Sequence, residues 1–236
     1  MLLGNFELLF NDPPGFLRLT VLVAFSLMVA ITSHEFSHVL VATGLGDNTA
    51  RRSGRLSLNP KNHLDPTGTV MMLVAGFGWG KPVPVDHHNL SHKQTGIALV
   101  AAAGPLSNLM VAFLLALPIK LRLLESSGFA LNRGARVMTG GPLDAMADIL
   151  GMVIFFNILL AVFNLIPLSP LDGSKVLAGM LPPSQANSYA RLERHGPVIL
   201  IGIIATDYML GLGILWGIIG PAIHLLTSLA IGSVSY

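Results

Sequence analysis

Long apolar stretches alternate with short polar ones along this chain, and their lengths predict helices that cross a membrane. Residues 16–43 form the first stretch, and Ile97–Ile119, which contains no charged residue, forms the second. The third runs from about Leu143 to Leu168. Because about 20 apolar residues suffice for a helix to cross the hydrocarbon core of a bilayer, each of the three is long enough to be a full span.

Other parts of the pattern are less regular. Residues 1–14 predict a short interfacial strand or amphipathic piece. Residues 67–80 are apolar but interrupted by glycines and too short to cross comfortably, which favours a re-entrant or interfacial segment. The two prolines in Lys81–Val85 bias their neighbours away from helix and predict an extended strand. Val198–Gly232 fits either one span with a tail or two short spans broken near Gly220-Pro221.

These segments predict an all-α polytopic membrane protein. We expect about four to six membrane segments, with a re-entrant or β-hairpin-like element between the first and second full spans. The composition agrees, since 52% of residues are hydrophobic and only 11% are charged, whereas a soluble domain carries about 25% charged residues. We expect a single membrane-embedded domain over residues 1–236, with a core at 16–180, C-terminal helices at 197–232 and no appended soluble module. A cleavable signal peptide is not expected, because no basic region precedes the first span.

The charged residues restrict the partners and indicate an orientation. A formal net charge of +2, with basic residues between apolar runs, argues against a nucleic-acid partner. If three full spans are counted, one side of the membrane carries nine basic residues: Arg51, Arg52, Arg55, Lys61, Lys81, Lys93, Lys175, Arg191 and Arg194. The other side carries five: Arg18, Lys120, Arg122, Arg133 and Arg136. The positive-inside tendency favours the first side as cytoplasmic. We interpret the Arg51–Arg55 cluster as an orientation signal first and a contact for anionic lipid second.

The first chemical signal is the sequence His34-Glu35-Phe36-Ser37-His38 near the end of the first span. Histidines four residues apart lie on one face of a helix, so both rings can reach one Zn²⁺, with the glutamate beside them as general base. A chance occurrence is the alternative. It is the weaker one, because ionisable side chains are costly to insert at membrane depth and usually mark a function there.

A catalytic zinc ion needs about three protein ligands, and the absence of cysteine leaves histidine and acids to supply them. The chain offers four acids near membrane depth: Asp144, Asp148, Asp172 and Asp207. We favour Asp172, because Pro167 and Pro170 break the helix before it and the predicted topology brings it to the membrane face of His38. The alternative is that Asp172 is the N-cap of a helix over residues 173–181.

This combination resembles the site-2 protease family of intramembrane zinc metalloproteases. HExxH in one transmembrane helix is followed, over a hundred residues later, by NxxPxxxLDG, here Asn164–Gly173. The sequence from Gly104 to Asn108 is similar to the GPxxN element of the family. Gly46–Gly68 and the GWGKPVPV segment resemble a small bacterial branch without PDZ or CBS domains. The resemblance covers roughly residues 16–180, and Ser174 departs from it, since many relatives have a second glycine there.

The resemblance implies a zinc-dependent intramembrane endopeptidase that cleaves single-span membrane proteins in or near the bilayer. It implies that His34, His38 and Asp172 bind one zinc ion per chain. Glu35 would activate a zinc-bound water and pass its proton to the leaving amine. A zinc-binding transporter or sensor without proteolytic activity is the alternative, against which stands the general base beside the ligands.

The resemblance also suggests how a substrate is held. Asn108 and Asn164 would bind the substrate or the developing oxyanion, although either could instead form a hydrogen bond between helices. The GWGKPVPV segment would pair with the unwound substrate backbone by strand addition. The implied partners are a transmembrane protein or peptide substrate and membrane lipid. The implied location is a bacterial inner (plasma) membrane, with the active site toward the cytoplasmic side.

The remaining histidines are not expected to bind the metal. Those in polar loops are interpreted as solvated: His63, His87, His88 and His92. His195 and His224 are interpreted as interfacial or packing residues.

Overall fold

Helices account for nearly all the regular structure in the computed structural model, which describes residues 6–75, 78–124 and 137–232. The β-structure in this described part is one isolated antiparallel bridge between Leu64 and Gly80. The elements are α1 (Phe6–Asn11), α2 (Pro13–Gly44), α3 (Thr49–Arg52), the 3₁₀ turn η2 (Pro60–Asn62), α4 (Pro66–Ala75), α5 (Lys93–Lys120), α7 (Pro142–Asn164), α8 (Asp172–Met180), α9 (Pro183–Leu210) and α10 (Ile214–Ile231).

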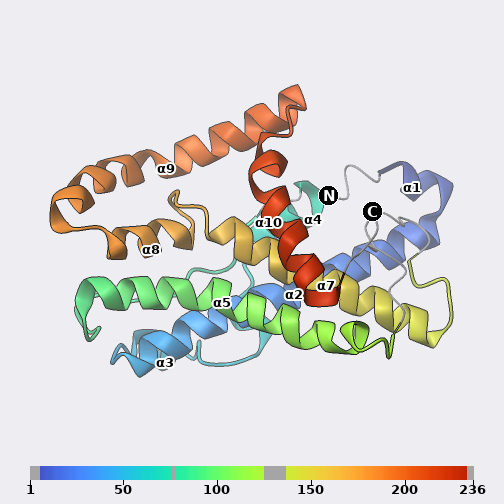
Figure 1. Ribbon diagram of the computed structural model, residues 1–236, viewed down its shortest axis with the longest axis horizontal. Helices are drawn as coiled ribbons and strands as arrows, with labels where there is room; N and C mark the ends of the chain where they lie inside the picture. Colours follow the sequence, from blue (N-terminus) through green and yellow to red (C-terminus); the bar gives the residue numbers. More distant parts are fainter. Residues whose placement is uncertain (1–5, 76–77, 125–136, 233–236) are drawn as a thin grey trace.

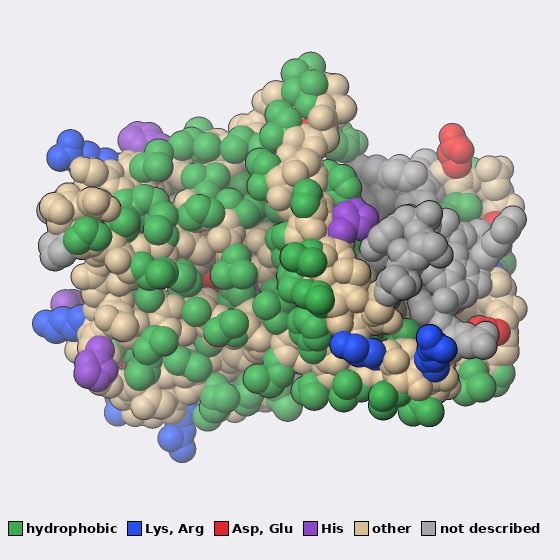
Figure 2. Space-filling view, in the orientation of Figure 1, with side chains coloured by type: hydrophobic (Ala, Val, Ile, Leu, Met, Phe, Trp, Pro, Cys, Tyr) green, Lys and Arg blue, Asp and Glu red, His purple; other side chains and the backbone are tan. Residues whose placement is uncertain are grey.

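Four of the described helices are long and apolar enough to cross a membrane: α2, α5, α7 and α10. The chain is therefore an integral multi-pass membrane protein, and the predicted all-α fold class is confirmed. Figure 2 agrees with this, because hydrophobic side chains cover the middle of the visible face and charged ones gather toward its ends. Apolar side chains can face outward here because lipid, not water, is the solvent at that depth.

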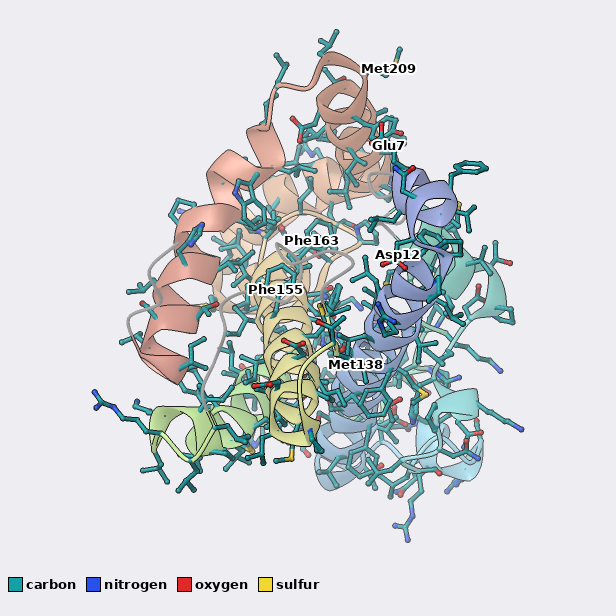
Figure 3. All side chains as sticks on the ribbon, turned by 90° about the vertical axis from the view of Figure 1, so that its right-hand side faces the viewer. Glu7, Asp12, Met138, Phe155, Phe163 and Met209 are labelled. Carbon is teal, nitrogen blue, oxygen red and sulfur yellow. The ribbon has the colours of Figure 1, made fainter. Side chains whose placement is uncertain are left out.

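The core lies where α2, α5 and α7 pack together and α10 crosses α5 and α7 (Figure 1). It is built from side chains such as Leu19, Phe156 and Ile223, which are almost completely buried. Figure 3 shows α7, with Phe155 and Phe163 labelled, between α2 and α10. The packing brings the second half of α2 against α5 and α7, and this is where the polar residues of the site lie.

The helices begin and end where local chemistry allows. Asp12 precedes α2, and its Oδ1 accepts a hydrogen bond from the Gly15 N–H at 3.0 Å, which satisfies one of the free donors of the first turn. The chain then runs through α3 and η2 to α4, so the glycine-broken region contains a ten-residue helix. Residues 1–14 were predicted as an interfacial strand or a short amphipathic piece; in their described part Phe6–Asn11 form the short helix α1, and Pro13 begins α2.

The predicted strand at Lys81–Val85 is wrong for the described chain, since these residues lie outside any strand there. Only Gly80, just before them, forms a bridge. Pro82 and Pro84 explain this, because neither has an N–H to donate to a ladder.

The C-terminal break also differs from the expectation. It falls at Gly211 and Gly213, which have positive φ angles of 61° and 65°, and not at Gly220-Pro221. Pro221 lies inside α10 instead. The left-handed backbone that this turn requires is open to glycine at little cost, and that explains its position. One candidate span, α10, follows the turn, and α9 before it lies along the outside of the bundle (Figure 1).

Candidate metal centre

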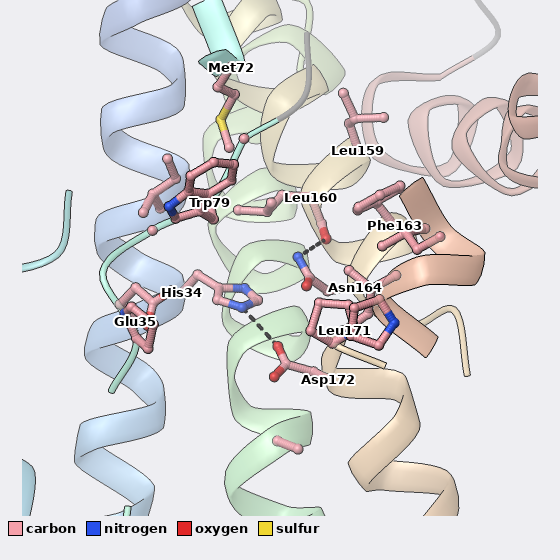
Figure 4. Close-up of a pocket in the computed structure, with 18 of the residues that line it drawn as sticks. His34, Glu35, Met72, Trp79, Leu159, Leu160, Phe163, Asn164, Leu171 and Asp172 are labelled. Carbon is pink, nitrogen blue, oxygen red and sulfur yellow. Dashed lines mark hydrogen bonds and ion pairs between the residues drawn. The ribbon is translucent and has the colours of Figure 1, made fainter. Parts of the chain in front are cut away.

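Two histidines from α2 and one aspartate from α8 meet inside the bundle. His34 Nε2 lies 2.9 Å from Asp172 Oδ2, and His38 Nε2 lies 3.2 Å from the same oxygen. The two rings stand edge to face, with centroids 4.6 Å apart. Figure 4 shows the His34 and Asp172 side chains pointing toward each other from their separate helices. Within the described chain, these three residues are the one group of His, Cys, Asp or Glu close enough to share a metal ion.

The turn after α7 aims Asp172 at the histidines. α7 ends at Asn164, and α8 begins at Asp172 with Leu171 as its N-cap. The interpretation of Asp172 as an N-cap is therefore wrong, because its carboxylate is directed at the histidines. Gly173 allows the chain to double back closely, since a Cβ there would collide with the carbonyl oxygens of Leu165 and Ile166. A residue with a side chain at this position would push Asp172 away from α2.

A second set of hydrogen bonds fixes the orientation of both rings. His34 Nδ1 lies 2.7 Å from Asn108 Oδ1, and His38 Nδ1 lies 2.7 Å from the Val100 carbonyl oxygen. Both partners are acceptors, so each Nδ1 carries the proton and donates. Each Nε2 then has its lone pair free, and both lone pairs face Asp172.

The donor set fits a cation. Two nitrogen lone pairs and a carboxylate oxygen converge on one point, an arrangement that is repulsive unless a positive charge lies among them. Ligand atoms around a tetrahedral zinc ion stand about 3.3 Å apart, because each bond measures about 2.0–2.1 Å, and the two nitrogen–oxygen distances are close to this. As a metal ligand, the Asp172 carboxylate would have to be in its ionised form.

Asn157 on α7 is a residue that sequence reasoning missed. Its Oδ1 accepts a hydrogen bond from Asn108 Nδ2 at 2.8 Å, and its own Nδ2 donates to the Val153 carbonyl oxygen. Asn108 Nδ2 also donates to the Ala30 carbonyl oxygen at 2.9 Å. These bonds turn the Asn108 oxygen toward His34. The available signal was a buried amide in an otherwise apolar run, since such a group must find partners.

The predicted substrate contacts differ in their surroundings. Asn108 is completely buried, and its Oδ1 and Nδ2 are both engaged, behind His34. Asn164 is half-buried at the end of α7 and lines the cavity; its Nδ2 uses one N–H for the Leu160 carbonyl oxygen (Figure 4). The second N–H of that amide remains for a ligand. Asn164 is therefore open to the cavity, whereas both polar atoms of Asn108 are engaged within the bundle.

Glu35 lies on α2 between the histidines and beside a cavity of about 1000 Å³. The cavity is mostly apolar and is lined by residues from α2, α4, α5, α7, α8, α9, α10 and the segment after α4. Gly80 lies so close that a Cβ there would stand 2.9 Å from Glu35 Oε1. Among the described residues, the Glu35 carboxylate has no hydrogen-bond partner, which leaves its oxygens available to a molecule in the cavity.

The other three acids considered from sequence cap backbone groups instead. Asp144 accepts from the Gly141 N–H, Asp148 from the Met138 N–H and Asp207 from the Ile214 N–H. The prediction that His63 is solvated is wrong: it is completely buried, and its Nε2 lies 2.6 Å from the Ser57 carbonyl oxygen. The three other loop histidines, His87, His88 and His92, are exposed as expected.

Comparison with known proteins decides the family. The model of peptidase family M50 matches residues 22–203, a range that contains both histidines, the glutamate and Asp172. This chain belongs to peptidase family M50. As an M50 peptidase it is a zinc metalloprotease of the site-2 protease type, with zinc as its cofactor, and the resemblance predicted from its motifs is confirmed. The family implies membrane-protein substrates and a lipid environment.

Individual relatives of this M50 peptidase are similar over most of its length. It is 37% identical over 200 residues to the "Putative zinc metalloprotease YwhC" of Bacillus subtilis, covering 85% of this chain and 86% of the relative. It is 26% identical over 200 residues to the "Putative zinc metalloprotease Rip2" of Mycolicibacterium smegmatis, covering 82% and 70%. The protein of the same name from Mycobacterium tuberculosis H37Rv is 27% identical over 194 residues, covering 80% and 69%. No solved structure matches the chain significantly.

Proposed function

We propose that His34, His38 and Asp172 are the zinc ligands of this peptidase and that Glu35 is its general base. The observation that carries the proposal is the convergence of two Nε2 lone pairs and one carboxylate oxygen, with both Nδ1 atoms held by acceptors. When bound, zinc polarises a scissile carbonyl and makes a water molecule acidic enough to attack it near neutral pH. We propose one ion per chain, because these residues supply a single three-ligand group among the described residues.

The residues of the chain then divide the remaining work. Glu35 takes a proton from the attacking water and donates it to the leaving amine, which separates the two halves of the cleaved peptide bond. Asn164, with an N–H available at the cavity, donates to the oxygen on which negative charge develops. Asn108 holds the His34 ring from behind, in place of the substrate contact expected from its motif.

The proposed substrate is a single-span membrane protein cut in or near the bilayer. Helix peptide bonds are shielded by their own hydrogen bonds, so the substrate must unwind before Glu35 and the metal can act on it. The unwound backbone would lie in the apolar cavity and pair with the segment Gly80–Val85, whose Val83 and Val85 line that cavity. This is the regulated intramembrane proteolysis that the sequence motifs suggest.

We infer that the site faces the cytoplasmic side of a bacterial inner membrane. α3, the start of α5 and α8 lie at the same end of the bundle (Figure 1), which is the end that carries the larger share of basic residues. Arg133 and Arg136, counted on the opposite side, lie outside the described residues. We further propose that residues 1–236 act as one membrane-embedded domain.

The test is zinc per purified chain together with cleavage of a single-span substrate in proteoliposomes. Wild-type protein is expected to hold about one zinc ion and to cleave. Asp172→Ala should lose both zinc and cleavage, while Glu35→Gln should keep zinc and lose cleavage. Equal zinc in wild type and Asp172→Ala would refute the ligand set, and full cleavage by Glu35→Gln would refute the role of the base.

A further inference from the structure

Arg55 is a buried cation in the loop between α3 and η2. It is only 5% exposed, whereas the neighbouring Arg51 and Arg52 are exposed. The interpretation of this cluster as a contact for anionic lipid is therefore wrong for Arg55. A guanidinium is always charged, and burying it is costly unless it is paired and hydrogen-bonded. The contacts of Arg55 therefore indicate what its burial contributes to the structure.

Arg55 holds the backbone of the segment Gly80–Val85. Its Nη2 donates to the carbonyl oxygens of Lys81 and Pro82, the second at 3.2 Å. On the other side of the same stretch, the Lys81 N–H donates to the His63 carbonyl oxygen at 2.7 Å. Residues 80–82 are thereby fixed to the loop that carries the buried side chains of Arg55 and His63.

The fixed stretch lies against the general base. A Cβ at Gly80 would stand 2.9 Å from Glu35 Oε1 and 3.3 Å from the His63 carbonyl oxygen. Arg55 is therefore connected to Glu35 through the backbone of residues 80–82.

The part of the segment without backbone hydrogen bonds to described residues follows Pro82, the last residue to which Arg55 donates a hydrogen bond. Val83 and Val85 line the cavity, and neither has a backbone hydrogen bond to a described residue. Pro82 and Pro84 have no N–H, so Val83 and Val85 carry the donors that remain. The position of these open groups is set by the last anchored residues before them, which Arg55 holds.

We propose that Arg55 is a positioning residue that fixes Gly80–Val85 beside Glu35 and so determines where the substrate backbone is held for cleavage. This rests on the proposed function of Glu35 and of the segment. Because a misplacement of about 1 Å can lower a rate about 100-fold, we expect Arg55→Met to lower kcat/KM by about 10- to 100-fold. Zinc per chain should stay at the wild-type value, since Arg55 does not contact the ligands.

Cysteine crosslinking measures the position of the segment Gly80–Val85 relative to the substrate, independently of activity. The chain has no cysteine, so Val83→Cys introduces a single thiol at the cavity. In a Glu35→Gln background the substrate stays intact, and single cysteines along its span can be tested one by one for a disulfide with position 83. We expect a sharp maximum at one or two substrate positions, and loss or spreading of that maximum when Arg55→Met is added.

Two further variants separate positioning from support of the fold. Arg52→Gln, at an exposed arginine of α3, is the matched control and should leave kinetics and crosslinks unchanged. Arg55→Lys keeps the charge and can reach one carbonyl, so it should recover part of the activity and of the crosslink. If the Arg55→Met protein binds less than half as much zinc as wild type, the proposal is judged on the kcat/KM and the crosslink pattern of Arg55→Lys alone.

The outcomes distinguish a failure of this proposal from a failure of the proposed function on which it rests. If wild type and Glu35→Gln cleave equally, the proposed function fails. If they differ as expected, yet the Arg55 variants match wild type in kcat/KM and crosslink pattern, Arg55 has no positioning role. A loss of activity that only parallels loss of zinc, with an unchanged crosslink pattern, would also overturn the proposal.

Discussion

A methyl group added at Gly104 is predicted to disrupt the metal centre without disrupting the fold. Gly104 lies on α5 directly against both histidines: a Cβ there would stand 2.5 Å from His38 Nε2 and 2.6 Å from His34 Cε1. Ordinary van der Waals contact begins at 3.4 Å. The two rings would have to retreat by about 0.9 Å, several times the roughly 0.2 Å tolerance of a zinc–ligand distance.

The size of the effect follows from that displacement. Substitutions that only disturb partners of zinc ligands weaken metal binding about 10- to 100-fold. Gly104→Ala moves two ligands directly, so we expect zinc affinity to fall by at least about 100-fold, or about 2.7 kcal/mol. Alanine is the better helix former by about 1 kcal/mol, which makes loss of α5 an unsuitable explanation for such a result.

The assay is a zinc titration of the purified protein against a chelator of known affinity, with cleavage measured alongside. Gly151→Ala is the matched control, because Gly151 also lies in a membrane helix and a Cβ there would meet nothing within 4 Å. Gly151→Ala should bind zinc like wild type. If Gly104→Ala binds zinc within threefold of that control, the proposed position of the ion between the two rings is refuted.

Two further predictions concern residues that hold the site in place. Asn108→Leu removes the acceptor of the His34 Nδ1 proton, so zinc affinity should fall about 10- to 100-fold; a raised KM with unchanged zinc affinity would instead restore Asn108 as a substrate contact. Asp47 is completely buried and accepts from the Thr49 and Asp86 N–H groups, so Asp47→Asn should destabilise the loop after Val85 by about 1–3 kcal/mol, measured by amide exchange. Burial alone would raise the pKa of Asp47, but the Thr49 hydrogen bonds outweigh it and lower that pKa below 3.8. The contribution of Asp47 is therefore full at neutral pH and is lost as pH falls below 3.8, so wild type and variant should converge in acid and a constant difference would contradict this assignment.

Local patterns in the sequence were enough to predict the first three membrane helices and the histidine pair. An apolar run of sufficient length has few alternatives to a membrane helix, and a spacing of four residues places two histidines on one helix face whatever surrounds them. These properties depend on neighbouring residues alone. Predicting the third proposed ligand required more than local pattern, because Asp172 was chosen from four acids through the proline-broken turn, the topology and the family motif.

Tertiary structure decided what depends on residues far apart in the chain. Asn157 reaches His34 only through Asn108, and Arg55 meets Lys81 only because the loops on either side of α4 fold together. No periodicity in the sequence records such contacts, since a buried polar group is satisfied by whichever partner packing brings to it. For the same reason Arg55, which the sequence predicts as an orientation signal or lipid contact, and His63, which it predicts to be solvated, are both buried.

The sequence by itself therefore determined the membrane environment of this protein, three of its four candidate spans and the residue types of its proposed metal ligands. The tertiary structure decided which nitrogen of each histidine faces Asp172, which of the four acids meets the histidines and which backbone segment lies against Glu35. The physical reason is range: hydrophobic length and helical spacing act within one segment, whereas tautomers, buried charges and ligand distances are set by contacts between segments.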